Sequence, residues 1–84
     1  MNTMLCNKRN EITARAGKLV ADGIKLPRTY DNNAHVLKMA LPFMGENIDP
    51  LTDAKIGKAI RTLDALLSDL ENNRPVSIVY SGEV

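Results

Sequence analysis

The sequence has 84 residues, which is room for one domain, and 44% of them are hydrophobic and 25% charged. These values are typical of a folded globular chain and exclude the composition of intrinsic disorder. Only 4% of the residues are aromatic and there is no tryptophan, so the core must be built from aliphatic side chains and methionine, a mixture that favours helices over a β-sandwich. The net charge of +1 disfavours a non-specific nucleic-acid binder.

The small size of the chain limits its stability. A domain of this length buries only about 60% of the surface that its unfolded chain exposes, and such domains usually need a disulfide, a metal ion or oligomerisation. With one cysteine, Cys6, and one histidine, His35, a single chain can form neither an internal disulfide nor a Cys/His zinc cluster. We therefore expect oligomerisation, with no metal and no cofactor.

The N-terminal segment, MNTMLCNKRNE, has no long apolar run before its charges. Nowhere does the chain approach the roughly 18 consecutive apolar residues of a membrane span. Together with the unpaired cysteine, this indicates a cytoplasmic protein that contacts no membrane.

A first helix is predicted over about residues 3–22. Gly23 stands just after its end and Pro27 prevents any continuation, as is typical of a helix C-terminus. Its beginning stays open. Asn10 could cap a shorter helix, and the segment TMLC could instead form a short strand.

The second predicted helix covers about residues 32–44. The loop before it, residues 25–33, has the composition of a turn that ends in a cap at Asp31 or Asn32. Pro42 should end or kink the helix. An element this apolar on nearly every side must be covered from more than one direction. Three bulky apolar residues of this segment are expected in the core: Met39, Phe43 and Met44. The alternative is that they form an adaptable binding surface.

The third predicted helix, about residues 50–73, has the clearest pattern. Asp49 before Pro50 offers a capping carboxylate and a proline at the first helical position. Its apolar residues follow the rhythm of a coiled-coil seam, and further members widen that stripe as in a bundle helix. We expect the stripe to build the core and an oligomer interface through Ile56, Ala59, Ile60, Leu63, Leu66, Leu67 and Leu70.

The charges of this helix predict how two copies would meet. Three basic residues occupy its N-terminal half and three acidic residues its C-terminal half, the order that the helix macrodipole disfavours. An antiparallel second copy would place each basic half beside an acidic half, with Lys55 and Asp69 on the flanks. The pattern predicts an isologous two-fold dimer, or a tetramer; solvated charges beside another helix of the same chain are the alternative.

After Pro75 the segment VSIVY has β-forming character, which predicts a short strand at residues 76–80. A single strand needs a partner for its backbone groups: the segment TMLC, the same strand of a second subunit, or the edge of another protein. The elements together predict a mainly α fold, a single small three-helix domain over residues 1–84 with a short C-terminal β-strand, completed as a helical bundle in a homo-oligomer.

No catalytic motif stands out. The chain lacks the spacings of phosphate-binding loops, zinc proteases, serine hydrolases and EF-hands, and Cys6 and His35 have no supporting motif. Gly17 and Gly57, inside predicted helices, indicate close helix approach. We expect no enzyme but a homo-oligomeric protein-binding regulator of the inhibitor, antirepressor or adaptor type, by analogy of size and style with compact phage and plasmid proteins.

The first 28 residues carry six basic side chains against two acidic ones. This region, the loop after it and the C-terminal strand are expected to meet a second protein, through Lys8, Arg15, Lys18, Lys25, Arg28, Tyr30, Ile78 and Tyr80. The alternative is a small dimeric DNA-binding transcriptional regulator that lays the basic face of its first helix along phosphates. The long loop and the apolar second helix do not match a helix-turn-helix.

Overall fold

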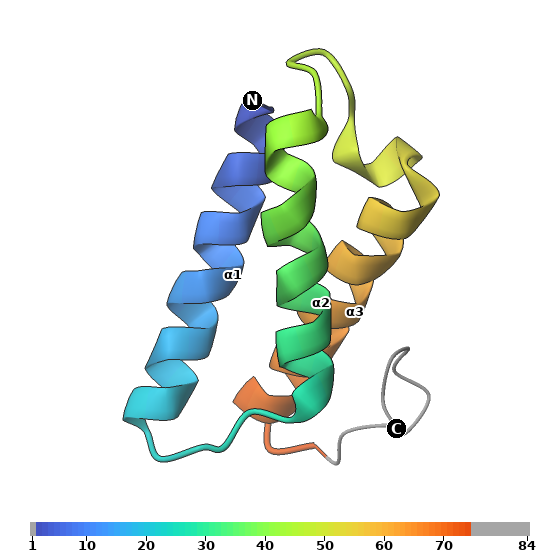
Figure 1. Ribbon diagram of the computed structural model, residues 1–84. Helices are drawn as coiled ribbons and strands as arrows, with labels where there is room; N and C mark the ends of the chain where they lie inside the picture. The colour runs from blue at the N-terminus through green and yellow to red at the C-terminus, as the bar shows by residue number, and fades with distance from the viewer. Residues whose placement is uncertain (1, 75–84) are drawn as a thin grey trace.

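The computed structural model describes residues 2–74, which form a bundle of three α-helices (Figure 1). Two short 3-10 helices connect the last two of them. The elements are α1 (Thr3–Ala21), α2 (Arg28–Ala40), η1 (Leu41–Phe43), η2 (Pro50–Thr52) and α3 (Ala54–Glu71). Within residues 2–74 no β-strand is present, and no helix there is both long and apolar enough to cross a membrane. The expected strand, with Ile78 and Tyr80, lies outside the described residues.

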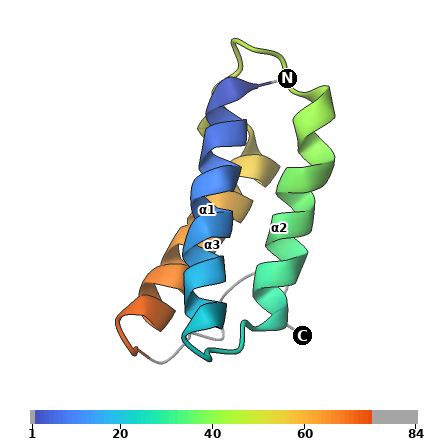
Figure 2. The same ribbon diagram turned by 90° about the vertical axis from the view of Figure 1, so that its left-hand side faces the viewer.

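The chain runs along α1, returns along α2 and turns again into α3, so α1 and α3 are parallel and α2 is antiparallel to both (Figure 1 and Figure 2). Of the two other α-helices, α2 contacts α3 more extensively than α1 does. The predicted mainly helical three-helix domain is confirmed for the described part of the chain.

The apolar stripe of α3 lies at the centre of the core, as predicted. Its residues are buried against the inward faces of α1 and α2. The core of the bundle contains Leu5, Ile12, Ala16 and Leu19 from α1, Leu37 from α2, Leu41 and Met44 from the following turn, and Ile56, Ala59, Ile60, Leu63 and Leu67 from α3.

The C-terminus of α1 is the one that the sequence predicts. Gly23 has a φ of +86°, a conformation that glycine adopts without a steric penalty. The N–H groups of Gly23 and Ile24 donate to the carbonyls of Val20 and Leu19, each at 3.0 Å. These two bonds make a Schellman motif, which satisfies carbonyls that the end of a helix leaves without partners.

The N-terminus of α1 depends on Asn2, a fully buried side chain. Its Oδ1 accepts from the N–H of Leu5 at 2.9 Å, so Asn2 caps the helix, and the proposals of an Asn10 cap or a strand at TMLC are wrong. The Asn2 Nδ2 also donates to the carbonyls of Gly45 and Ile48. One side chain therefore starts α1 and anchors the loop before α3.

Two substitutions separate these roles of Asn2. We expect Asn2→Ala to lower the free energy of unfolding by about 1–3 kcal/mol, because it removes a cap and leaves two carbonyls without their donor. Asn2→Asp keeps the capping oxygen but brings a carboxylate to those carbonyls, so we expect it to cost at least as much. Chemical denaturation measures both, and an aspartate variant as stable as the wild type would contradict a role beyond capping.

α2 begins at Arg28, four residues before the predicted start, and neither Asp31 nor Asn32 is its cap. Pro27 precedes it in an extended conformation, and Asp31 lies in the first turn, where a carboxylate is favourable. The polar Thr29 and Asn33 are buried, and the Asn33 amide donates to the Thr29 carbonyl at 2.8 Å. Because the inward face of this turn is polar, the sequence there lacks the apolar periodicity from which a helix is predicted.

Pro42 ends α2 as predicted, since the α-helix stops at Ala40 and η1 follows. The turn of η1 sends Phe43 outward, and its side chain is 84% exposed. Met39 is also more than half exposed, whereas Met44 is buried. The expectation that all three belong to the core is wrong for Phe43 and Met39.

The predicted helix at 50–73 is divided in two. The Asp49 carboxylate accepts from the N–H of Leu51 and caps only the short η2. α3 begins after Asp53, whose Oδ1 accepts from the N–H groups of Lys55 and Ile56, each at 3.0 Å. Asp53 thus supplies the N-cap that we assigned to Asp49.

The two helical glycines have different surroundings. A Cβ at Gly57 would lie 3.0 Å from the Leu51 carbonyl oxygen and 3.0 Å from Nη1 of Arg61, so α3 and η2 approach closely there, as predicted. A Cβ at Gly17 would meet no atom within 4 Å, and close packing is the wrong explanation for this glycine.

We expect Gly17→Ala to raise the free energy of unfolding by about 0.5–1 kcal/mol, because alanine has the higher helix propensity and has room. Gly57→Ala should gain nothing, because the backbone of Leu51 would have to move. Denaturant titration of both variants checks this difference, and equal gains would show that the Gly57 contact is unimportant.

Candidate interaction surfaces

The basic face of α1 is engaged by α3. Lys8 Nζ lies 3.1 Å from Oδ2 of Asp64, and Arg15 Nη1 lies 3.1 Å from Oδ1 of the same residue. Arg15 also donates to both oxygens of Glu71, through Nε at 3.1 Å and Nη2 at 2.8 Å. Two of the predicted partner-binding residues, Lys8 and Arg15, thus pair within the chain.

These contacts bear on the reversed charge order of α3. Because α1 and α3 are parallel, the acidic half of α3 lies beside the second half of α1, so Asp64 and Glu71 fit the alternative of charges packed beside another helix of the same chain. Asp69 pairs with Arg74 at 3.0 Å. The acidic half of α3 is thus accounted for without a second copy, whereas its basic half makes no ion pair within residues 2–74.

The bidentate hydrogen bond from Arg15 lowers the pKa of Glu71 below its ordinary 4.5 and raises that of Arg15. A lowered carboxylate pKa contributes stability that is present above about pH 4.5 and is lost as the pH falls through the lower folded-state value. Both side chains are partly exposed, so water and salt screen the pair.

We expect Glu71→Gln to cost less than about 1 kcal/mol at neutral pH, because the pair is screened. The difference from the wild type should shrink as the pH falls below about 4.5, where the wild-type carboxylate also becomes neutral. Thermal unfolding across this pH range measures it, with Glu11→Gln as a matched control. A cost that persists in acid would assign the effect to packing instead.

The basic end of the bundle holds three other predicted partner-binding residues. Lys25 and Arg28 line an open hollow of about 500 Å³ beside Leu26 and Leu70, and Lys18 lies in a neighbouring one with Arg15 and Glu71. Tyr30 is half-buried against the core, and burial together with the charge of Asp31 raises its pKa. The structure therefore brings Lys25 and Arg28 together and leaves Tyr30 only partly accessible.

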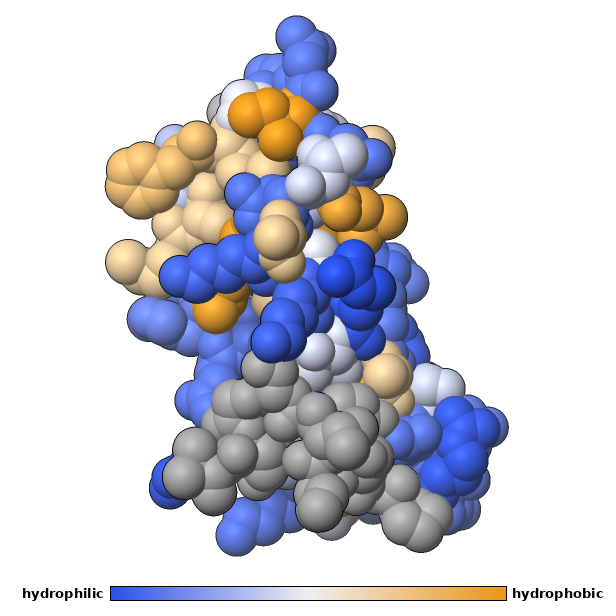
Figure 3. All heavy atoms as spheres, turned by 90° about the vertical axis from the view of Figure 1, so that its right-hand side faces the viewer, coloured by the Kyte–Doolittle hydropathy of each residue, from blue (hydrophilic) through white to orange (hydrophobic). Residues whose placement is uncertain are grey.

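Apolar side chains gather at the opposite end, around the turn from α2 to α3 (Figure 3). Phe43 is the most exposed of them, and several others are about half exposed. The exposed set at this end contains Met4, Met39, Phe43, Ile48 and Leu51. We call it the apolar end. Single exposed apolar residues are ordinary, but several at one place mark an interaction surface.

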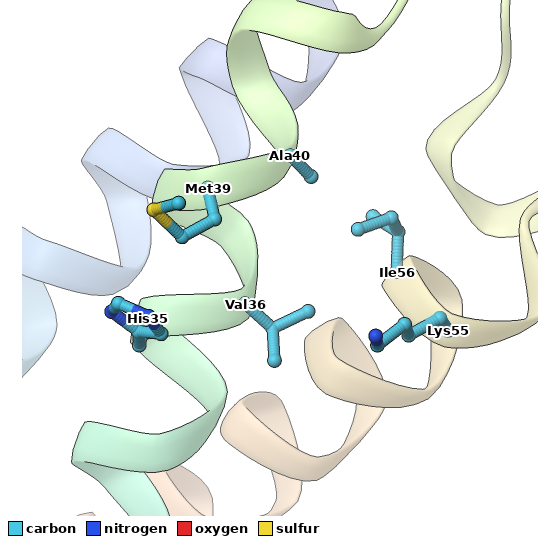
Figure 4. Close-up of a pocket in the computed structure, with 6 residues that line it drawn as sticks. All are labelled: His35, Val36, Met39, Ala40, Lys55 and Ile56. Carbon is cyan, nitrogen blue, oxygen red and sulfur yellow. The ribbon is translucent and has the colours of Figure 1, made fainter.

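An open groove of about 360 Å³ lies between α2 and α3 near this end (Figure 4). Val36 from α2 and Lys55 from α3 face one another across it, and Ala40 and Ile56 stand at one end of the gap. Met39 and His35 line the α2 side. The groove combines apolar walls with a basic edge, and none of its lining residues is acidic.

The predicted oligomer interface lies mostly inside the single chain. Its apolar members are buried, apart from the partly exposed Leu70. A second copy could reach them only if the bundle opened, so contact between copies through the stripe stays a prediction. Of the predicted flanking charges, Lys55 is exposed at the groove.

The sequence predicted a role for Lys55 and Ile56 in an oligomer interface, but it predicted neither the groove that they line nor a role for the loop at 45–53. The available signal was the excess of apolar residues around Pro42, for which a binding surface is the alternative and the core is the prediction.

Among residues 2–74 no cluster of three or more His, Cys, Asp or Glu side chains could hold a metal ion. The sequence matches no protein-family model, and no curated protein or solved structure shows significant similarity to it.

Proposed function

We propose that this chain is a non-enzymatic, homo-oligomeric regulator that acts by binding another protein. The observation that carries the proposal is the apolar end, where Phe43 and its neighbours stand in water. Exposed apolar surface is unfavourable in water, and a bundle this small has little free energy of folding to offset it. Burial of this surface on association would be favourable.

The basic end supports a contact with a second, acidic protein. Lys25 lies in the loop before α2 and Arg28 is the first residue of α2, and the hollow beside them is floored by apolar Leu26 and Leu70. Asp31 also lines this hollow, so its rim carries two cations against one carboxylate and stays net positive. A net positive rim around an apolar floor suits a partner surface with carboxylates around an apolar side chain. Such binding weakens as salt rises, because the charges become screened.

The DNA-binding alternative has less support. It relied on a basic face of α1, and Lys8 and Arg15 from that face already pair with carboxylates of α3. Of the three cations on that face, Lys18 alone makes no ion pair among residues 2–74, and one cation cannot follow a line of phosphates. A mobility shift that retards duplex DNA at moderate salt would restore this alternative.

The partner contact is tested with the double variant Lys25→Glu and Arg28→Glu. The wild-type chain is used to capture a protein from the source cells, and the captured protein is purified and titrated against each variant. We expect the double variant to bind about tenfold more weakly or worse, because it reverses the charge of the basic rim. Arg9→Glu is the control, with no expected change.

The outcome that contradicts the proposal is a captured protein that binds the double variant and the wild type equally. Salt dependence gives a second measurement, since raising the salt from about 50 to 500 mM should weaken only the wild-type complex substantially. Circular dichroism of each variant confirms that the bundle is folded before its affinity is compared.

A further inference from the structure

We propose that the groove between α2 and α3 is covered by the loop 45–53 of a second copy of this chain, and that the second copy's groove is covered in return. The inference rests on the homo-oligomeric part of the proposed function and names the contact that makes the oligomer. It assigns the contact between copies to exposed surfaces of the folded chain, because the apolar stripe of α3 is buried in the core.

The groove supplies one half of the contact. Val36, Met39, Ala40 and Ile56 give it apolar walls, and Lys55 stands at its edge. Lys58 follows one turn further along α3, beyond the residues that line the groove, and Arg61 lies on the side of α3 that faces Leu51; both are exposed. Within residues 2–74 none of these three cations makes an ion pair with a carboxylate. The groove therefore suits an occupant that is both apolar and acidic.

The loop supplies the other half. Ile48 and Leu51 are about half exposed, and they alternate with three acidic residues. Asp49 and Asp53 each use one carboxylate oxygen to accept backbone N–H groups, which leaves the second oxygen for another donor. The loop thus presents apolar side chains between carboxylates, the complement of the groove.

The acidic residues of α3 are already engaged in ion pairs. Asp64 and Glu71 pair with α1, and Asp69 pairs with Arg74. The loop also needs little ordering before it docks, because the Asn2 amide donates to the carbonyls of Gly45 and Ile48. A segment held in place loses less conformational entropy on binding than a mobile one.

The position of the two surfaces suits a two-fold dimer. The groove and the loop are neighbours, because η1 leads from α2 into the loop and η2 leads from the loop into α3. When two complementary patches lie side by side, a two-fold rotation places each against its complement on the other copy. Phe43, between the patches along the chain, would then lie near the two-fold axis.

Charge reversal with rescue tests this arrangement. Lys55→Glu with Lys58→Glu makes the groove edge acidic. Glu46→Lys with Asp49→Lys gives the loop a net positive charge, and Asp53 is kept because it caps α3. Sedimentation equilibrium measures the dimer dissociation constant. We expect each double variant alone to dimerise about tenfold more weakly or worse, because its groove and loop then carry like charge.

An equimolar mixture of the two double variants should dimerise about as tightly as the wild type. In the mixed dimer the acidic groove meets the basic loop, and the two unchanged patches meet as before. Lys18→Glu with Lys25→Glu is the matched control, since it reverses two charges elsewhere and should leave dimerisation unchanged. Phe43→Ser, with no change of charge, should weaken the dimer in every pairing.

The outcomes separate the inference from the function on which it rests. A wild-type oligomer that neither double variant weakens, or that the mixture fails to restore, overturns the groove contact and leaves the homo-oligomer to another surface. A wild-type chain that stays at its monomer mass of 9.2 kDa at every concentration overturns both the contact and self-association. Binding of a second protein is tested independently at the basic end.

Discussion

The width of the apolar stripe on α3 is the constraint from which the rest of the bundle follows. Ile56, Ile60, Leu63 and Leu67 cover more of the helix surface than one neighbour can bury, so α3 needs α2 on one side and α1 on the other. With both helices used in this way, no element of residues 2–74 remains to cover the outer side of α2. The exposure of Met39 and Phe43 is therefore a consequence of how the core is completed.

The ion pairs between α1 and α3 add direction to this packing. An apolar stripe by itself is compatible with a parallel or an antiparallel neighbour. In the parallel bundle Lys8 and Arg15 both pair with Asp64, and Arg15 also pairs with Glu71. Partly exposed pairs contribute little stability. Their contribution is to favour the parallel arrangement, because in a fully overlapped antiparallel one Arg15 would lie beside the basic half of α3.

Much of the fold could be predicted because several helix ends are determined by residues close to them in the sequence. Gly23 and Pro42 act through backbone geometry alone, and the period of α3 is set by its own apolar residues. The start of α2 could not be predicted, because Thr29 and Asn33 turn polar side chains inward. The candidate surfaces were largely missed. Which charges of α1 remain free and which way Phe43 points both depend on elements far away in the sequence.

The buried Asn2 links the stability of the bundle to its surface. Because its amide holds the loop that carries Ile48 and Leu51, these exposed side chains belong to a fixed structure. Fixed apolar side chains cannot collapse onto one another to avoid water, so their exposure persists until something covers them. A partner that covers them adds its binding free energy to that of folding. For a bundle this small, association at the apolar end and stability of the core are then coupled, and the side chain that begins α1 contributes to both.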